Sequence, residues 1–185
     1  LQQLLCGFIV TNDGKTIEVK NNRINCMLDA IEEMSGKVII WARFRHDIVA
    51  ITNALRKKYG HVSTVNYYGD TSEKDRQDAI LGIENDPSVR FFVANPQTGG
   101  RGLTLVKATN VIYYSNDFDL EKRIQSEDRN HRSGQTNQVV YVDLIAKGTI
   151  DEYIVKVLHN KIVLAGKALN EEAKKWLQIS PKKDD

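Results

Sequence analysis

The amino-acid sequence predicts an α/β fold in which a mostly parallel sheet is covered by helices. From residue 37 onward, short apolar runs rich in β-branched residues alternate with longer amphipathic stretches. This alternation is typical of consecutive strand–helix–strand units. The chain has 185 residues, of which 41% are hydrophobic, so it is long enough to bury a sizeable core.

Residues 1–36 form an N-terminal connecting segment with a different pattern. The turn sequence NDG at residues 12–14 separates two short apolar runs, which predicts a β-hairpin. Ile24, Leu28 and Ile31 then recur at helical spacing, so a helix should follow the hairpin.

Residues 37–148 carry the alternating pattern and are expected to form one lobe. Ligands of such a sheet bind at the carboxyl ends of the strands, so functional residues are expected in the loops that follow them. The predicted strands cover residues 38–42, 62–68, 89–95, 110–115 and 138–146, and the predicted helices cover residues 46–58, 72–84 and 120–132.

Residues 149–185 are predicted to be a helical extension with a frayed tail. Thr149 and Glu152 have the spacing of a capping box, in which each side chain binds a backbone N–H of the first turn. A long helix should therefore run from Ile150 towards Lys167.

Composition excludes several kinds of protein and site. The 26 basic and 24 acidic residues give a net charge of +2, so any contact with DNA must be local. Cys6 and Cys26 are too few and too far apart for zinc, and the four histidines lack ligand spacing, so no metal site is predicted. No apolar run reaches the roughly 18 to 20 residues of a membrane span, and there is no signal-peptide pattern, so a cytoplasmic protein without a membrane partner is expected.

The stretch QSEDRNHRSGQ, residues 125–135, concentrates polar groups that suit phosphate recognition. In a helix, Gln125, Arg129 and Arg132 at positions i, i+4 and i+7 would project from one face. Two guanidinium groups can bind phosphate oxygens in pairs, but they could equally form surface ion pairs with Glu127 and Asp128. This window alone leaves both interpretations open.

A second candidate site is GGRG, which follows the predicted strand at 89–95. Gly99, Gly100 and Gly102 lack a Cβ atom, so their backbone can approach a phosphate or sugar closely. A dinucleotide-binding fingerprint would require a further glycine where Leu105 stands, so a Rossmann oxidoreductase is disfavoured.

The order of the loops resembles the C-terminal RecA-like lobe of superfamily 2 helicases. WARF, GDTSEKDR and TGGRGLTL follow three successive strands, and the arginine-rich stretch precedes the last one. That stretch is similar to the Q-x-x-D-R-x-H-R-x-G-Q motif of Swi/Snf-type DNA translocases, with all seven specified positions met. The resemblance covers about residues 37–160 and implies a three-layer αβα fold with a mostly parallel sheet.

The same resemblance assigns roles to the candidate residues. It implies that Arg129 and Arg132 are arginine fingers, which stabilise the charge that develops on the γ-phosphate of ATP, and that Gln125 helps to position them. It places Gly100 and Gly102 at the nucleotide cleft, together with Gln125 and both arginines. The candidates for contact with the DNA backbone are Arg43, Thr71, Thr98 and Gly99.

Three departures from the Swi/Snf pattern suggest a divergent bacterial or phage-type member. The family more often has Ser-Gln-Phe at residues 42–44, Asn at Thr104 and Trp-Asn-Pro at residues 118–120. The expected location is therefore the bacterial cytosol or nucleoid, or a phage-infected cell.

Neither a P-loop nor a magnesium-holding acid is evident. The Gly-Lys-Thr at residues 14–16 would need a glycine at Ile9 to form a Walker A motif. The Asp-Glu pair at residues 151–152 opens the capped helix and is followed by Tyr153, so it is interpreted as a helix cap.

ATP and Mg²⁺ are thus expected to be held mainly by another, N-terminal RecA-like lobe of the same protein. This chain should act as the second half of a monomeric motor that contacts DNA through its backbone, and should be inactive alone. Two alternatives stay open: the corresponding lobe of an RNA helicase, and a non-catalytic RecA-like module that binds proteins.

Overall fold

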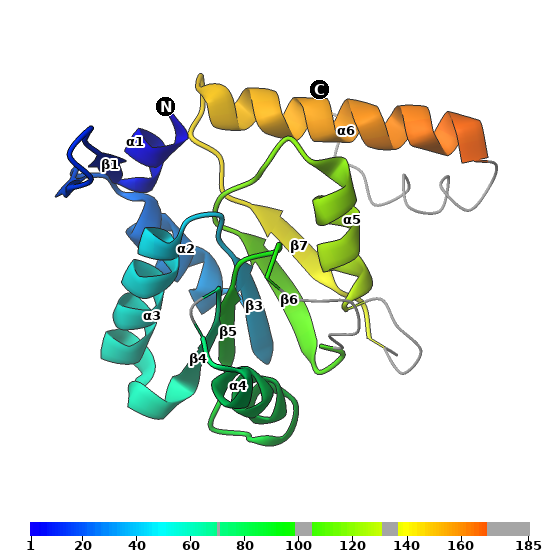
Figure 1. Ribbon diagram of the computed structural model, residues 1–185. Coiled ribbons are helices and arrows are strands. Elements are labelled where there is room, and N and C mark those ends of the chain that lie inside the picture. Colours follow the sequence, from blue (N-terminus) through cyan, green and yellow to red (C-terminus); the bar gives the residue numbers. More distant parts are fainter. Residues whose placement is uncertain (70, 99–104, 131–136, 170–185) are drawn as a thin grey trace.

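A computed structural model of the chain describes residues 1–69, 71–98, 105–130 and 137–169. Its centre is a five-stranded sheet with the order β4-β5-β3-β6-β7, in which every neighbouring pair is parallel (Figure 1). This confirms the predicted α/β fold and every predicted strand, although β4, β5 and β7 are shorter than expected and β3 and β6 begin one and two residues earlier. They are β3 (Lys37–Trp41), β4 (Thr64–Tyr67), β5 (Phe91–Ala94), β6 (Ala108–Tyr113) and β7 (Val140–Asp143).

Helices cover both faces of the sheet, as a three-layer fold requires. Side chains of β3 alternate between the faces, with Val38 and Ile40 on one side and Ile39 and Trp41 on the other. The first face is covered by α2 (Arg23–Glu32) and α3 (Arg45–Tyr59), and the second is packed against α4 (Glu73–Asn85) and α5 (Leu120–Asp128).

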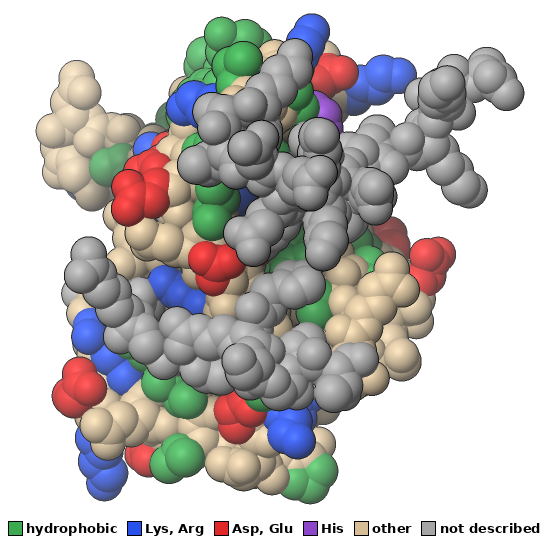
Figure 2. Space-filling model, turned by 90° about the vertical axis from the view of Figure 1, so that its right-hand side faces the viewer, with side chains coloured by type: hydrophobic (Ala, Val, Ile, Leu, Met, Phe, Trp, Pro, Cys, Tyr) green, Lys and Arg blue, Asp and Glu red, His purple; other side chains and the backbone are tan. Residues whose placement is uncertain are grey.

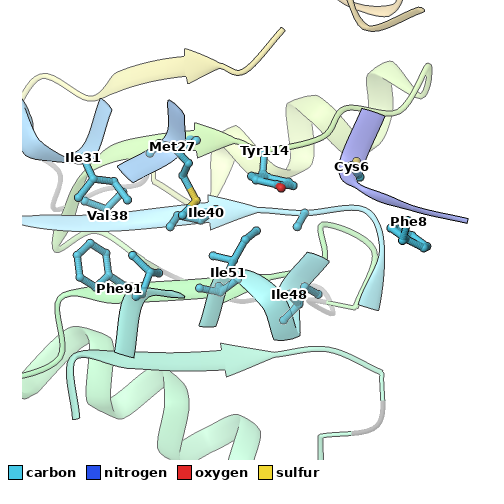
Figure 3. Close-up of a cluster of buried hydrophobic side chains, with 14 residues drawn as sticks. Cys6, Phe8, Met27, Ile31, Val38, Ile40, Ile48, Ile51, Phe91 and Tyr114 are labelled. Carbon is cyan, nitrogen blue, oxygen red and sulfur yellow. The ribbon is translucent and has the colours of Figure 1, made fainter. Parts of the chain in front are cut away.

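The core of the first face includes part of the N-terminal segment. Met27 and Ile31 of α2 and Ile48 and Ile51 of α3 are fully buried against Ile40 and its neighbours (Figure 3). Burial of such a side chain contributes about 1.5–3 kcal/mol. Cys6 and Phe8 belong to the same cluster, so the beginning of the chain packs directly against the lobe.

The predicted hairpin is confirmed as β1 (Phe8–Val10) paired with β2 (Thr16–Glu18). It follows a short helix, α1 (Gln2–Cys6), which ends at Gly7 in the left-handed conformation with φ of 93°. A Cβ atom on Gly7 would lie 2.5 Å from Nδ2 of Asn21. Glycine is therefore required here by both the backbone angle and the space.

Two of the helices on the second face begin at residues that cap them. Ser72 accepts a hydrogen bond from the backbone N–H of Asp75 at 3.2 Å and starts α4. Asp119 accepts one from Lys122 at 3.3 Å and starts α5, which holds the pKa of Asp119 below its ordinary value. A short 3₁₀ helix, η1 (His61–Ser63), precedes β4 and includes residues 62 and 63, which the sequence predicted to be strand.

The predicted end of α5 at residue 132 is wrong. The helix ends at Asp128, because the backbone N–H of Asn130 donates to the carbonyl of Glu127, three residues back, and forms a tight turn. The carbonyl of Arg129 accepts a hydrogen bond from the N–H of Leu105 at 2.9 Å. The expected single helical face with Gln125 and both arginines is therefore not formed by α5, and Arg132 lies outside the described residues.

The long C-terminal helix is confirmed as α6 (Ile150–Leu169), although its first turn differs from the predicted capping box. The Thr149 hydroxyl accepts from the N–H of Asp151, and the Glu152 carboxylate accepts from the N–H of Gly148. The helix packs back on the lobe through Ile154 and Leu158, which are buried. None of the helices within the described ranges has the length and apolar character that a bilayer crossing requires.

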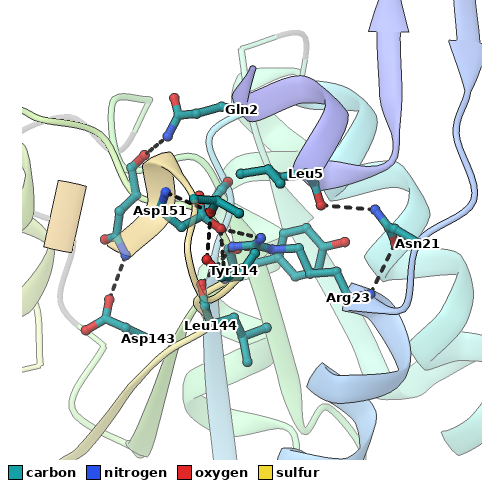
Figure 4. Close-up of polar contacts among 12 residues, drawn as sticks. Gln2, Leu5, Asn21, Arg23, Tyr114, Asp143, Leu144 and Asp151 are labelled. Atoms are coloured by element: carbon teal, nitrogen blue, oxygen red, sulfur yellow. Dashed lines mark hydrogen bonds and ion pairs between the residues drawn. The ribbon is translucent and has the colours of Figure 1, made fainter. Parts of the chain in front are cut away.

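Arg23, at the start of α2, joins three distant parts of the chain (Figure 4). Its guanidinium donates to the carbonyls of Tyr114 and Leu144, each at 2.7 Å, and to the carboxylate of Asp151 at 2.6 Å. The side chains of Arg23 and Asp151 are both 7% exposed. Asp151 therefore serves as a buried ion-pair partner that fixes the first turn of α6, a role that the sequence did not reveal.

Candidate functional site

The loops that follow β3, β5 and β6 are joined by hydrogen bonds at the carboxyl edge of the sheet. Asn95 donates to the carbonyl of Arg43 at 2.7 Å, and the N–H of Arg43 donates to the hydroxyl of Ser115 at 2.9 Å. Together with the start of α5, these loops line a pocket. Its lining residues are Arg43, Asn95, Pro96, Gln97, Tyr113, Ser115, Asn116, Asp117, Asp119, Lys122, Arg123 and Ser126.

Arg43, a predicted DNA contact, lies at the rim of this pocket. Its side chain is 36% exposed, lies 3.7 Å from the carboxylate of Asp117 and donates a hydrogen bond to Gln2. Its guanidinium also lies 5.4 Å from the ring centre of Phe44. Arg43 is thus accessible from solvent, with its charge partly balanced by an acidic neighbour.

The two predicted DNA-contacting loops after β4 and β5 lie side by side. A Cβ atom on Gly69 would be in van der Waals contact with the methyl group of Thr98, at 3.8 Å. Thr98 donates to the carbonyl of Asn95 at 3.0 Å, and Thr71 accepts from the N–H of Tyr68 at 3.1 Å, so both hydroxyls stabilise their own turns. The candidates Gly99, Gly100 and Gly102 lie outside the described residues.

Arg129 is buried at the same carboxyl edge of the sheet. It is 5% exposed, and its guanidinium lies 5.0 Å from the ring centre of Trp41 and donates to the carbonyl of Pro96 at 3.1 Å. A cation over an indole face is favourable. Gln125 is instead exposed on α5, where it donates to Glu121 at 2.8 Å. The two candidates therefore differ in their surroundings.

Arg123, which the sequence did not single out, organises one wall of the pocket. It donates to Asp143 at 2.6 Å and to Asn116 at 2.9 Å, pairs with Glu127, and lies 3.4 Å from the ring centre of Tyr113. Burial alone would lower the pKa of Arg123, but its neighbours raise it above the ordinary value. The i, i+4 spacing to Glu127 was the only local signal of this network.

Phe118, in the tripeptide FDL that departs from the Swi/Snf pattern, contacts the C-terminal helix. Phe118 lies edge-on to Tyr153, with ring centres 5.9 Å apart, and its carbonyl accepts a hydrogen bond from Lys161 at 2.8 Å. The tripeptide therefore ends the loop after β6 and attaches it to α6, while Asp119 caps α5.

Charged side chains of both signs are interspersed on the face shown in Figure 2.

Within the described part of the chain, no group of three or more His, Cys, Asp or Glu side chains converges. The magnesium ion implied by the family resemblance remains an expectation for the other lobe.

The sequence comparison identifies the class of this lobe. Residues 20–134, more than half of the chain, match the family described as the helicase conserved C-terminal domain, and the chain belongs to this family. It is 39% identical over 108 residues to the chromatin-remodeling ATPase INO80 of Mycosarcoma maydis. That match covers 56% of this chain but only 6% of the relative.

Solved structures narrow the class to the C-terminal lobe of Swi/Snf-type ATPases. The C-terminal part of the Fun30 ATPase domain superposes with a TM-score of 0.67 and 26% identity, covering 76% of this chain and 48% of that one. The SWI2/SNF2 ATPase C-terminal domain of Sulfolobus solfataricus gives a TM-score of 0.55 and 27% identity, covering 74% and 54%. The predicted RecA-like lobe is thereby confirmed, whereas the bacterial or phage origin remains a prediction.

Proposed function

We propose that the chain is the second half of an ATP-dependent DNA translocase or helicase motor. Its relatives are ATPases and helicase domains, which supports an ATP-driven enzyme for the whole protein. In this proposal ATP and Mg²⁺ are held mainly by an N-terminal RecA-like lobe, and Arg129 and Arg132 act on the γ-phosphate from this lobe. Gln125 helps to position them, and Gly100 and Gly102 lie at the same cleft.

The position of Arg129 is the observation that carries the proposal. Arg129, the first arginine of the DRxHR sequence, lies against the last residue of β3 and against the loop that leads into the glycine-rich motif. Three segments far apart in the sequence therefore meet at the carboxyl edge of the sheet, where ligands of α/β folds bind. This arrangement supports a nucleotide site more than a surface cluster of charges.

The proposed DNA contacts lie along the same edge. Arg43 is partly exposed there, and the turns of Thr71 and Thr98 are adjacent. Together with Gly99 they would present backbone amides, the Thr71 hydroxyl and one guanidinium to phosphates, which suits a motor that tracks along DNA without reading its sequence.

The experiment compares alanine substitutions in the full-length protein with both lobes. Arg132→Ala should lower kcat of DNA-stimulated ATP hydrolysis by about 10³-fold or more, with a smaller effect on ATP binding. Arg132→Lys should restore little activity, because lysine keeps the charge but loses the planar fork.

Arg129→Ala should have a similar effect on kcat, but its burial adds a loss of stability. Arg56 provides a matched control, since it also donates to a carbonyl, that of Thr64 at 3.0 Å, at the opposite edge of the sheet. Arg56→Ala should lower the thermal midpoint and leave kcat unchanged. Normal turnover of the Arg132→Ala protein would refute the finger assignment.

A further inference from the structure

Asn130 lies in the middle of the arginine motif, at a position that the motif leaves unspecified. Its side chain is 0% exposed, and its amide nitrogen donates to two carbonyls, that of Leu105 at 3.0 Å and that of Ala108 at 3.3 Å. Both donor hydrogens of the amide are therefore used in one short turn of backbone.

A third hydrogen bond runs between the same two segments. The N–H of Leu105 donates to the carbonyl of Arg129 at 2.9 Å. Residues 129–130 are thus bound to residues 105–108 by backbone and side-chain bonds together. Leu105 is the last residue of the stretch TGGRGLTL, and Ala108 is the first residue of β6.

This arrangement connects the arginine motif, which the proposed function places at the γ-phosphate, with the end of the glycine-rich stretch, which it places at the same cleft. Asn130 follows Arg129 directly and precedes Arg132 by two residues, while its bonding partners are the last residue of that stretch and the first residue of β6. Two hydrogen bonds from one planar amide fix both the distance and the orientation between the segments. A group held in this way moves together with its partners.

We propose that Asn130 is a positioning residue that couples the arginine motif to the glycine-rich motif. The inference rests on the proposed function, because it assumes that the arginines act on the nucleotide. Asn130 itself has no contact with the nucleotide in this proposal; its amide holds the backbone from which the arginines project. A small misplacement of such groups is enough to lower the rate about 10²-fold.

The test uses the full-length protein and the variants Asn130→Ala and Asn130→Gln. We expect kcat of DNA-stimulated ATP hydrolysis to fall by about 10- to 100-fold, with KM for ATP nearly unchanged. Asn130→Gln keeps the amide but displaces it by one methylene group, so it decides the question if the alanine variant does not fold. The kcat of Asn130→Gln should fall at a temperature well below its thermal midpoint, where the protein is still fully folded.

Asn110 of β6 supplies a matched control. It is buried, lies two residues after Ala108 and donates to the carbonyl of Ser35 at 2.6 Å, away from the arginine motif. Asn110→Ala should lower the thermal midpoint about as much as Asn130→Ala while leaving kcat unchanged. If the Asn130 variants also keep a normal kcat, the residue is only structural and the inference is wrong.

The Arg132→Ala protein separates this inference from the proposed function. If Arg132→Ala is inactive while both Asn130 variants turn over normally, only the positioning role fails. If Arg132→Ala itself turns over normally, the proposed function fails and the positioning role fails with it.

Discussion

Arg23 and Arg123 lie on opposite faces of the sheet, each beside one of two consecutive tyrosines at the end of β6. Arg23 is 5.3 Å from the ring centre of Tyr114, and Arg123 is 3.4 Å from that of Tyr113. Each also pairs with an aspartate at 2.6 Å, Asp151 for Arg23 and Asp143 for Arg123. The remaining partners differ. Arg23 binds backbone carbonyls, whereas Arg123 binds the side chains of Asn116 and Glu127.

This difference separates a structural arginine from one that lines a site. Backbone acceptors belong to the fold itself, so Arg23 permanently joins α2, the end of β6 and the start of α6. The side-chain partners of Arg123 can adopt other rotamers, and Arg123 forms part of the pocket wall. We therefore expect substitutions of Arg23 to affect stability, and substitutions of Arg123 to affect both stability and the site.

The largest expected effect is that of Arg23→Ala. Removing the cation leaves the buried carboxylate of Asp151 without its charged partner, which should cost about 3–5 kcal/mol of unfolding free energy. Urea denaturation would measure the loss. The double variant Arg23→Met with Asp151→Leu should recover much of it, because it removes both charges. If the double variant loses as much unfolding free energy as the two single variants lose together, the hydrogen bonds of Arg23 to the carbonyls dominate.

Arg123→Ala should cost less unfolding free energy, about 2–3 kcal/mol, because water can partly solvate the Asp143 carboxylate that loses its partner. The side chain of Asp143 is 22% exposed, three times the value for Asp151. Arg123→Lys should recover only part of the loss, since lysine cannot bind Asp143 and Asn116 through one planar group. Equal losses for Arg23→Ala and Arg123→Ala would remove the distinction between the two arginines.

The stability of the face that holds Arg23 should also depend on pH, through a buried carboxyl group. Burial raises the pKa of Asp47 to about 7, although Cys6, Arg23 and Ser115 act in the opposite direction. The folded state therefore holds a proton on Asp47 that the unfolded chain releases above pH about 4. This contribution to stability is complete below that pH and is lost as the pH rises through about 7.

Asp47→Asn tests this contribution, since asparagine cannot ionise. The variant should be more stable than the parent at pH 8, by on the order of 4 kcal/mol, and should lack the decline between pH 4 and 7. Thermal midpoints measured across this range compare the two proteins. A parallel pH profile for parent and variant would contradict the assignment to Asp47.

The smallest effects on stability are expected at the exposed rim of the pocket. Arg43→Ala should change the unfolding free energy by less than about 1 kcal/mol, because the side chain is partly exposed. In the full-length protein it should weaken DNA binding and reduce the slope of log affinity against log salt by about 1. Lys58→Ala is the control, since Lys58 is also 36% exposed and paired with an acid, Glu32. Equal salt slopes for the two variants would exclude Arg43 as a phosphate contact.

The sequence predicted the sheet and its helices because these depend on local patterns. Buried parallel strands appear as short apolar runs, and Ser72 and Asp119 mark where α4 and α5 begin. The end of α5 was missed because it depends on Leu105, which binds the carbonyl of Arg129 from 24 residues away. The roles of Arg23 and Asp151 were missed for the same reason, since 128 positions separate them.

The sequence motifs predicted only some of the residues of the candidate site. The motifs selected Arg129 and the loops that converge on it, and the structure places Arg129 beside the end of β3. Asn130 was overlooked because the motif is tolerant at that position, although its amide joins two motifs. Gln125 and Arg129 were expected on one face, but a tight turn at Asn130 places them in different surroundings.

Two of the polar contacts that hold α6 to the lobe are far enough apart along the helix to relate small shifts of the lobe to its orientation. Asp151 fixes its first turn to Arg23, and Lys161 fixes it to the carbonyl of Phe118 at the start of α5. The attachments are ten residues apart, or about 15 Å, on a helix about 30 Å long. A shift of about 1 Å between them, transverse to the axis, turns the helix by about 4° and displaces its far end by about 2 Å. Small movements of the loop after β6 are thus doubled at the end of the helix.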